Sequence, residues 1–224
     1  MLKNVIGLMS GTSMDGIDAA FLKTDGLCHV EAGEAITVPY TEDLRKQISE
    51  VVTSCKVSKT IEELVTVIHA EVITQLLNKK KSSSNEIDLI GFHGHTIYHN
   101  PDIRKTLQIG DGELLAKLTG VDVVCDFRSN DVMHGGQGAP LVPLYHRAVA
   151  SQLAKPLAIL NLGGVANITW LGHEDELLAF DTGPGNALLD DFMNFRLGEK
   201  QDTGGKMALS GNVDQSILAT LLEH

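Results

Sequence analysis

Two glycine-rich stretches carry residues suited to binding phosphate. The first, GLMSGTSMDGID at residues 7–18, combines three glycines with three hydroxyl residues and two aspartates. Consecutive amides around Gly11, Thr12 and Ser13 can form a concave donor surface for phosphate oxygens. No lysine follows as in a P-loop, and the GxGxxG spacing is absent. The stretch favours a phosphate clamp of another kind, and a plain turn between strands is the simpler alternative.

The second stretch, LNLGGVANIT at residues 160–169, also places glycines between two apolar runs. Gly163 and Gly164 take the position that Gly11 takes in the first stretch, and Asn167 follows them. Two such loops are expected to face a shared phosphate-binding cleft. A simple Gly-Gly hairpin remains the alternative.

Asp181 is the candidate catalytic group. In FDTGPGNALLDD, residues 180–191, we expect it at the end of a strand, ahead of a glycine-proline turn and a helix. Ligands of α/β folds bind in the crevice at strand ends, where a carboxylate can act as general base toward a hydroxyl or water. Capping of the turn that follows is the alternative role for Asp181.

A polar segment at residues 125–146 has the composition of a substrate-binding wall. It offers the guanidinium of Arg128 as a fork-shaped cation, together with a glycine-rich loop. The loop residues are Gly135, Gly136, Gln137 and Gly138. A solvated linker between domains is the alternative, although the segment holds no Lys or Glu.

The histidines of HGHTIYH raise the question of a metal. His93 and His95 have the HxH spacing that can chelate zinc from a strand, and His99 and His134 lie further on. No acidic or cysteine ligand has the usual partner spacing, so we predict no metal ligands and favour hydrogen bonding of His93 and Thr96 to a polar substrate. A metal-dependent hydrolase using His93, His95 and Asp181 stays open as an alternative.

Composition and charge indicate which partners and which cellular location to expect. The 224 residues carry a formal net charge of −11, which argues against nucleic-acid or anionic-membrane binding, because such partners are held by Lys and Arg. The start lacks a signal-peptide apolar segment and no apolar run of about twenty residues occurs, so a cytoplasmic location is expected. The cysteines are odd in number and far apart, which indicates reduced thiols; they are Cys28, Cys55 and Cys125.

The chain must position these groups with an α/β fold. Strands are predicted at 3–10, 17–24 and 28–40, and helices at 41–54 and 58–81, the latter with one apolar stripe. Continuous apolar runs at 87–94 and 121–127 predict parallel strands buried on both faces, joined by a crossover helix at 110–120. The pattern then restarts, with strands within 157–172 and at 176–183 and a helix at 185–198, which indicates an internal duplication.

Six ordered motifs resemble the anhydro-N-acetylmuramic acid kinase family. They are GLMSGTSMDGIDAAF, IGFHGHTIYHNP, LQIGDG, CDFRSNDVMHGGQGAPLVP, LNLGGVANIT and FDTGPGNALLDD, and they are collinear from residue 5 to about 215. The resemblance implies the actin and sugar-kinase fold, a ribonuclease-H-like domain with a mixed sheet at residues 1–130 and an incomplete second domain of the same type at 131–224. It also implies an ATP- and Mg²⁺-dependent kinase that opens the anhydro ring and phosphorylates the sugar at O6.

The resemblance also assigns roles by position. Asp181 would activate the water that attacks the anomeric carbon. ATP would be held by the two glycine loops, at Gly11, Thr12, Ser13, Met14, Asp15, Gly16, Ile17, Asp18, Gly163, Gly164 and Asn167. The sugar would be held by His93, Thr96, Arg128, Gly135, Gly136, Gln137 and Gly138.

Two departures from the family pattern leave an alternative open. His95 stands where the family usually has glutamine, and the family's glycine-rich adenosine loop and closing strands are absent. The chain could therefore be a fragment that needs a complementary C-terminal polypeptide, or a sugar- or phosphate-binding remnant without kinase activity. Unpaired strand edges and exposed apolar surface favour association, so a homodimer or a complemented pair is expected.

Overall fold

The computed structural model describes residues 1–223, and contacts divide the chain into two compact units. The first is Met1–Gln152 and the second begins at Leu153. The segment 131–152 is thus grouped with the first unit, although the sequence places a domain division after residue 130. By contacts alone the second unit begins later, and the division at residue 130 stays a prediction about the two related domains.

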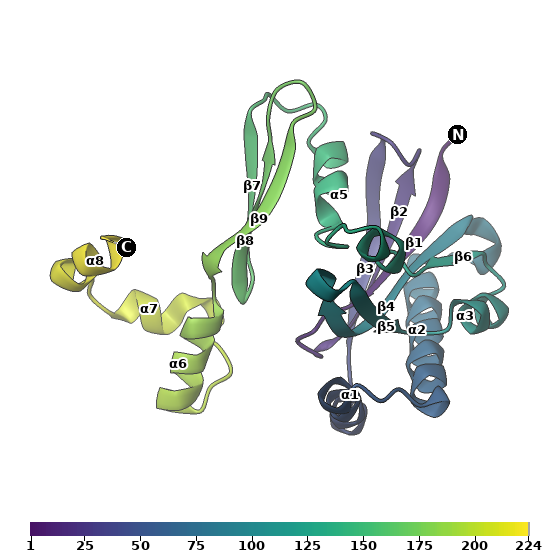
Figure 1. The fold of residues 1–224 in the computed structure, drawn as a ribbon, viewed down its shortest axis with the longest axis horizontal. Helices are drawn as coiled ribbons and strands as arrows, with labels where there is room; N and C mark the ends of the chain where they lie inside the picture. Colours follow the sequence, from purple (N-terminus) through teal and green to yellow (C-terminus); the bar gives the residue numbers. More distant parts are fainter. Residues whose placement is uncertain (224) are drawn as a thin grey trace. The chain divides into compact units, whose positions relative to one another are not determined.

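A mixed sheet forms the centre of the first unit (Figure 1). Its strand order is β3-β2-β1-β4-β5, and β6 also pairs with β4. The pairs β1–β2 and β2–β3 are antiparallel, whereas β1–β4 and β4–β6 are parallel. The strands are β1 (Lys3–Ser10), β2 (Gly16–Thr24), β3 (Val30–Pro39), β4 (Leu89–Asn100), β5 (Lys105–Ile109) and β6 (Val123–Cys125). The predicted α/β class with a mixed sheet is confirmed.

Three helices of the first unit begin at polar capping residues. Thr41 caps α1 (Glu42–Ser54), Ser58 caps α2 (Lys59–Lys80) and Asp111 caps α3 (Gly112–Thr119), each accepting from an amide of the first turn. The predicted stripe of α2 is buried against the sheet, with Val65, Val72 and Leu76 fully enclosed. Two shorter helices follow, α4 (Ser129–Met133) and α5 (Val142–Val149), and two 3₁₀ turns, η1 (Ser84–Glu86) and η2 (Pro101–Ile103), lie before them.

The predicted elements differ from the observed ones around β4. This strand runs on to Asn100 and pairs with β5, an antiparallel strand that periodicity did not predict. As predicted, β4 is buried on both faces over its first half. The same prediction is wrong for β6, where Val124 is 43% exposed, because this three-residue strand pairs only with β4.

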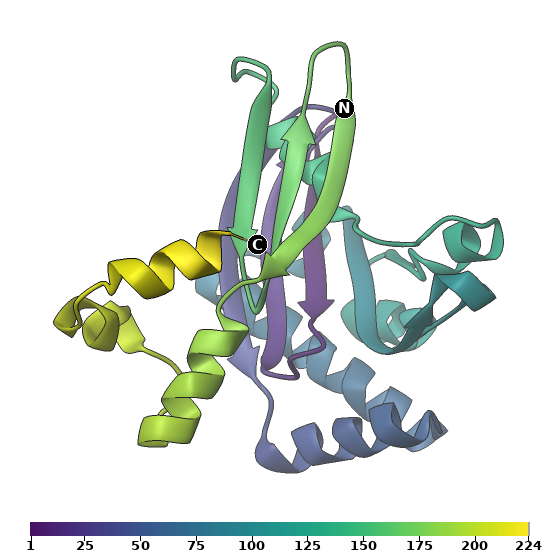
Figure 2. The same ribbon diagram turned by 60° about the vertical axis from the view of Figure 1, so that its left-hand side comes forward.

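The second unit is built on an antiparallel meander in the order β7-β8-β9. Its strands are β7 (Leu157–Leu162), β8 (Val165–Leu171) and β9 (Leu177–Pro184), as the sequence predicts. The helices α6 (Ala187–Leu197), α7 (Lys206–Ser210) and α8 (Gln215–Leu222), with the 3₁₀ turn η3 (Thr203–Gly205), follow from one end of this sheet (Figure 2). Both units thus begin with a strand, a glycine loop and two further antiparallel strands.

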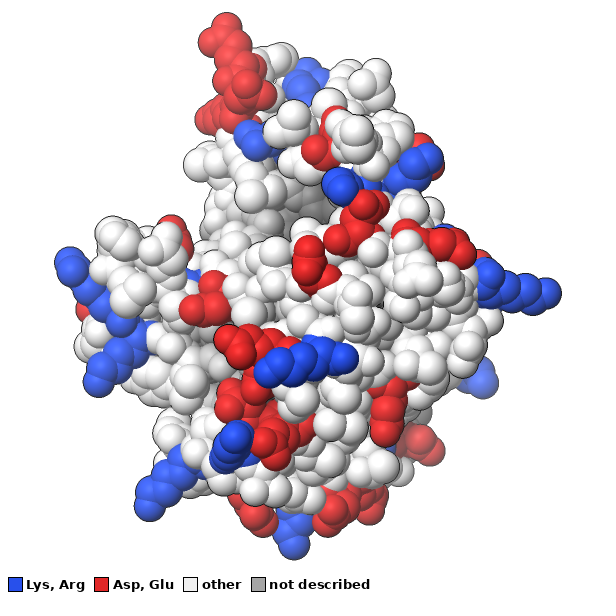
Figure 3. Space-filling view, turned by 90° about the vertical axis from the view of Figure 1, so that its right-hand side faces the viewer, with Lys and Arg blue, Asp and Glu red and all other residues white. Residues whose placement is uncertain are grey.

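Figure 3 shows the charged side chains on one face of the molecule. On the face drawn in Figure 3, Lys and Arg side chains stand singly among Asp and Glu side chains. Within the described residues, no helix has the length and apolar character needed to span a membrane.

Candidate functional site

The first glycine loop ends β1 with a tight turn whose amides are available. The Met14 amide donates to the Gly11 carbonyl at 3.0 Å, and Met14 has a φ of 56°. The amides of Gly11, Thr12 and Ser13 make no hydrogen bond within the part of the chain that the structure describes. Thr12 and Ser13 are exposed. The loop therefore presents free donors of the kind that bind an anion.

The C-terminal part of this loop and the start of β2 are bonded to β3 and to the residue that follows it. The Tyr40 amide donates to the Asp15 carbonyl at 3.0 Å, and the Thr37 hydroxyl donates to the Asp18 carboxylate at 2.5 Å. A Cβ on Gly16 would overlap the carbonyl of Val38. Close backbone packing therefore requires glycine at position 16.

His93 and Arg128 come together in the first unit. The Arg128 Nε donates to His93 Nε2 at 2.9 Å, and Arg128 Nη1 donates to the Gly138 carbonyl at 2.6 Å. The other ring nitrogen of His93, Nδ1, lies 2.9 Å from the Gly94 carbonyl and donates to it, because Nε2 is the acceptor. Burial is the main cause that lowers the pKa of His93, and the nearby Arg128 charge adds to it. Two of the three guanidinium nitrogens of Arg128, Nε and Nη1, thus donate to groups of the protein.

The glycine loop 135–138 is held by α4. Asp131 accepts from the Gly138 amide at 2.7 Å through its carboxylate and from the Gly136 amide at 2.8 Å through its carbonyl. Gly138 is therefore bonded on both sides, by Arg128 and Asp131, which lie three residues apart. Asp131 is not among the predicted site residues, although a spacing of three residues at a helix start places its side chain near that of Arg128.

The second glycine loop is bonded to the start of α6. The amides of Gly185 and Asn186 donate to the carbonyls of Gly164 and Gly163 at 2.9 and 2.7 Å, and Asn186 Nδ2 donates to the Leu162 carbonyl at 2.8 Å. A Cβ on Gly185 would overlap the Gly163 carbonyl. The two glycine turns of this unit thus form one packed corner.

Asp181 lies inside β9 and not at its end, because β9 continues to Pro184. Asn167 pairs with Asn161 on β7 and with Asp181 on β9. Directly paired residues of antiparallel strands share a face, so the three polar side chains form one row across the meander. The Asp181 side chain is exposed and holds no hydrogen bond within the described residues, which gives the turn-capping alternative no support.

Two further histidines, His69 and His95, lie in the core of the first unit. His69 and His95 are fully buried, and burial lowers the pKa of each to about 4. His95 Nδ1 lies 2.8 Å from the Ser10 hydroxyl, so His95 contacts the protein interior and not solvent. No cluster of three or more His, Cys, Asp or Glu side chains able to hold a metal occurs among the described residues.

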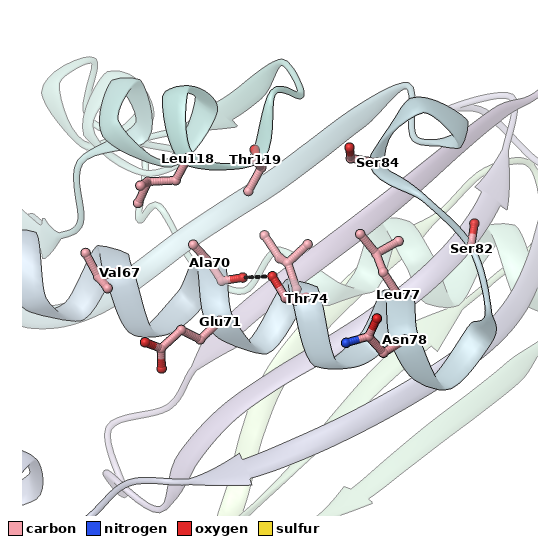
Figure 4. A pocket seen from close by; sticks show the side chains of 11 residues that line it. Val67, Ala70, Glu71, Thr74, Leu77, Asn78, Ser82, Ser84, Leu118 and Thr119 are labelled. Carbon is pink, nitrogen blue, oxygen red and sulfur yellow. Dashed lines mark hydrogen bonds between the residues drawn. The ribbon is translucent and has the colours of Figure 1, made fainter.

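Two of the cavities in the first unit border β4 and α2. One, of about 200 Å³, adjoins the His93 side chain and is lined in part by Gln108, Asp126 and Ser129. A second, of about 410 Å³, runs along α2 and is closed by Leu118 and Thr119 of α3 (Figure 4). In the second, the Thr74 hydroxyl donates to the Ala70 carbonyl at 3.1 Å. The first cavity is lined in part by the predicted site residue His93, and a further cavity of the first unit is lined in part by Met14 of the first glycine loop.

The mixed sheet and its glycine loops define an α/β protein that presents polar groups at strand ends. The family model for anhydro-N-acetylmuramic acid kinase matches residues 3–224, so the chain belongs to that family. A kinase so named from Paramagnetospirillum magneticum is 49% identical over 98% of this chain and 62% of its own length. Another, from Rhodospirillum rubrum, is 50% identical over 98% of this chain and 59% of its own length. The chain thus spans about three fifths of these relatives.

Solved structures show more distant likeness. A Ppx/GppA family member of Aquifex aeolicus is 11% identical with a TM-score of 0.41, over 85% of this chain and 54% of that one. The ethanolamine utilization protein EutJ from Carboxydothermus hydrogenoformans is 12% identical with a TM-score of 0.37, over 87% of this chain and 56% of that one.

Proposed function

We propose that the chain carries the sugar and phosphate sites of an ATP-dependent kinase that converts 1,6-anhydro-N-acetylmuramic acid to N-acetylmuramic acid 6-phosphate. The observation that carries this proposal is the family match over residues 3–224. The free amides of Gly11, Thr12 and Ser13 support it, because a phosphate-binding loop needs unpaired donors. The reaction consumes ATP and one water and gives ADP and the sugar phosphate.

In this proposal Asp181 takes a proton from the attacking water. The water oxygen bonds to the anomeric carbon, the bond from that carbon to O6 breaks, and O6 accepts the γ-phosphoryl group of ATP. The exposed carboxylate of Asp181 fits the role of general base, since it has no protein hydrogen bond among the described residues. Asn161 and Asn167 beside it offer amide groups to orient the water.

The phosphates of ATP would meet the amides and hydroxyls of residues 11–13. Bound Mg²⁺ would neutralise phosphate charge, and it usually keeps several waters and few protein ligands. The amides of Gly163 and Gly164 in the second glycine loop are further candidates for binding these phosphates, and their carbonyls have a second role. Because the carbonyls of Gly163 and Gly164 bind the start of α6, this corner gives rigidity to the strands that carry Asn167 and Asp181.

The sugar would lie against the loop 135–138 and the β4 side chains. Arg128 is bonded to His93 and to Gly138. We therefore propose that the main role of Arg128 and His93 is to fix the conformation of this loop. Thr96 and Gln137 are the side chains of the predicted set with hydrogen-bonding capacity toward hydroxyl or acetamido groups.

Release of ADP in the presence of the anhydro sugar tests this function. Asp181→Asn is expected to lower the rate by at least about 100-fold, the scale of a lost general base. Asp175→Asn is the matched control, because Asp175 lies in the β8–β9 turn with a φ of 66° that asparagine also adopts. Equal rates for Asp181→Asn and wild type would exclude Asp181 as the base.

A second candidate is that these residues act only together with a further polypeptide. Two observations favour it: the chain spans about three fifths of its relatives, and the second unit exposes large apolar side chains such as Phe195 and Leu221. The same assay on the chain fused to the unmatched part of the Rhodospirillum rubrum relative distinguishes the two. Activity only in the fusion supports the second candidate, and equal activity of the chain alone contradicts it.

A further inference from the structure

A buried chain of side-chain hydrogen bonds lies beneath the first glycine loop. The Ser10 hydroxyl is 2.7 Å from the Tyr40 hydroxyl and 2.8 Å from His95 Nδ1. Ser10 and His95 are almost completely enclosed, at 1% and 0% exposure, and Tyr40 is 9% exposed. The three residues come from the end of β1, the middle of β4 and the connection between β3 and α1. The Ser10 hydroxyl thus connects three segments of the chain by hydrogen bonds.

Ser10 is the last residue before the turn with free amides. Its backbone pairs with His95 across the parallel β1–β4 ladder, but the register shifts between Leu8 and Ser10. The regular ladder is therefore interrupted where the loop begins. At this point the side-chain bond from Ser10 to His95 adds a connection between the two strands.

His95 suits this position as a neutral ring. Its Nε2 atom is buried and has no partner within the described residues, so a charged imidazole would bury an unpaired N–H group and a charge. The neighbouring titratable side chains are His93, His69 and Tyr40, and none of them offers a negative charge at neutral pH. The neutral ring can either accept from Ser10 or donate to it, and Ser10 then completes the chain to Tyr40.

We propose that His95 is a positioning residue that acts through Ser10 to hold the Gly11–Ser13 turn in its open-amide conformation. The inference rests on the proposed phosphate role of that turn for its functional meaning. It requires no direct contact between His95 and a ligand, in agreement with the complete burial of the ring. Glutamine at position 95 would serve the same purpose, because its amide also offers a donor and an acceptor at similar reach.

Amide hydrogen exchange of Met14, measured by NMR on the full chain, tests the proposal. The Met14 amide donates to the Gly11 carbonyl, so its exchange rate reports whether this hydrogen bond of the turn is formed. His95→Leu is expected to raise its exchange rate at least about tenfold, and His95→Gln to restore the wild-type rate within about twofold. His69→Leu is the control, because it removes another fully buried imidazole that makes no hydrogen bond to Ser10.

The variant Ser10→Ala tests whether the effect of His95 passes through Ser10. If His95 acts through Ser10, Ser10→Ala raises Met14 exchange by a similar factor, and the double variant adds little to either single change. An unchanged Met14 rate in both Ser10→Ala and His95→Leu overturns the proposal, as does an equal rise in His69→Leu. Should His95→Leu fail to fold, Ser10→Ala and His95→Gln decide the matter.

Calorimetric titration with Mg²⁺ and ATP separates this inference from the proposed function. If His95→Leu binds ATP more weakly than wild type and His95→Gln binds it equally well, both the positioning role of His95 and the phosphate role of the turn are supported. If wild type binds no nucleotide while Met14 exchange follows the expected pattern, the phosphate role fails and the positioning role stands.

Discussion

Arg128, a predicted substrate-binding residue, also binds two groups of the protein. Its guanidinium was expected to bind substrate, but two of its donors reach His93 Nε2 and the Gly138 carbonyl. Asp131 then accepts from the Gly138 amide. Charge-assisted bonds of this kind are shorter and stronger than neutral ones. The pair therefore gives the loop 135–138 a fixed conformation, which a sugar-binding loop requires.

Buried imidazoles make the stability of the fold depend on pH. The folded-state pKa of His69 and His95 is about 4, below the ordinary 6.5, because burial disfavours the charged ring. Between these values the unfolded chain binds protons that the folded chain does not. The free energy of unfolding is therefore highest above pH 6.5 and falls as the pH drops toward 4, by on the order of 3 kcal/mol for each ring.

Urea unfolding at pH 7.5 and pH 5.5 measures this dependence. His95→Gln removes one of three buried imidazoles whose pKa is lowered, the others being His69 and His93, so it is expected to reduce the loss of stability between these pH values by at least about a third. A variant of an exposed ring, His173→Gln, should keep the wild-type dependence. An undiminished loss in His95→Gln would show that His95 already titrates normally in the folded chain.

Residue types could be predicted from the sequence more readily than their partners. The glycines at 11, 163 and 164 were predicted to lie between strands, and they do, whereas the catalytic role of Asp181 stays a prediction. The bond from His95 to Ser10 joins residues 85 positions apart, so no local pattern could indicate it. The apolar pattern of α2 likewise did not predict that His69 lies within it, fully buried.

At the scale of elements, the two glycine corners are rigid for the same physical reason. A Cβ on Gly16 would overlap the Val38 carbonyl, and one on Gly185 would overlap the Gly163 carbonyl. In each case glycine allows two backbone segments to approach closely. The strands around these corners were predicted well, because apolar runs bounded by glycine indicate them directly. The strand β5 was missed because its five residues are too few to show alternation.

Alanine substitution in the first hairpin tests this close packing. Gly16→Ala must displace backbone atoms of β3, so it is expected to lower the free energy of unfolding by about 2 kcal/mol or more. Gly7→Ala in the adjacent strand is the matched control, since a Cβ there meets nothing within 4 Å. That change should leave stability within about 1 kcal/mol of wild type. Thermal unfolding of both variants gives the comparison, and similar melting temperatures would contradict the packing argument.

For the whole molecule, the second unit carries an excess of exposed apolar side chains. Phe195 is 86% exposed and Leu221 is 70% exposed. Large exposed apolar areas mark association sites in soluble proteins, while the net charge of −11 opposes nonspecific aggregation. We therefore expect specific association, with a second copy or with a complementary polypeptide.

Sedimentation velocity at rising protein concentration tests this expectation. The double variant Phe195→Ser/Leu221→Gln is expected to shift the protein toward the monomer, because both changes remove exposed apolar area. Leu27→Ser, at an equally exposed site in the first unit, should not alter the distribution. A strictly monomeric wild type would contradict self-association and leave the complementary polypeptide as the partner to be tested by mixing.

The most direct test of the account is product analysis after reaction in heavy-oxygen water. The chain, alone or in the fusion described above, is incubated with ATP, Mg²⁺ and the anhydro sugar, and early products are analysed by mass spectrometry. The account predicts N-acetylmuramic acid 6-phosphate with one heavy oxygen at the anomeric carbon, in equal amount to ADP, and neither product with Asp181→Asn. ADP formed with inorganic phosphate and an intact anhydro ring, or no nucleotide turnover in either form of the protein, would contradict it.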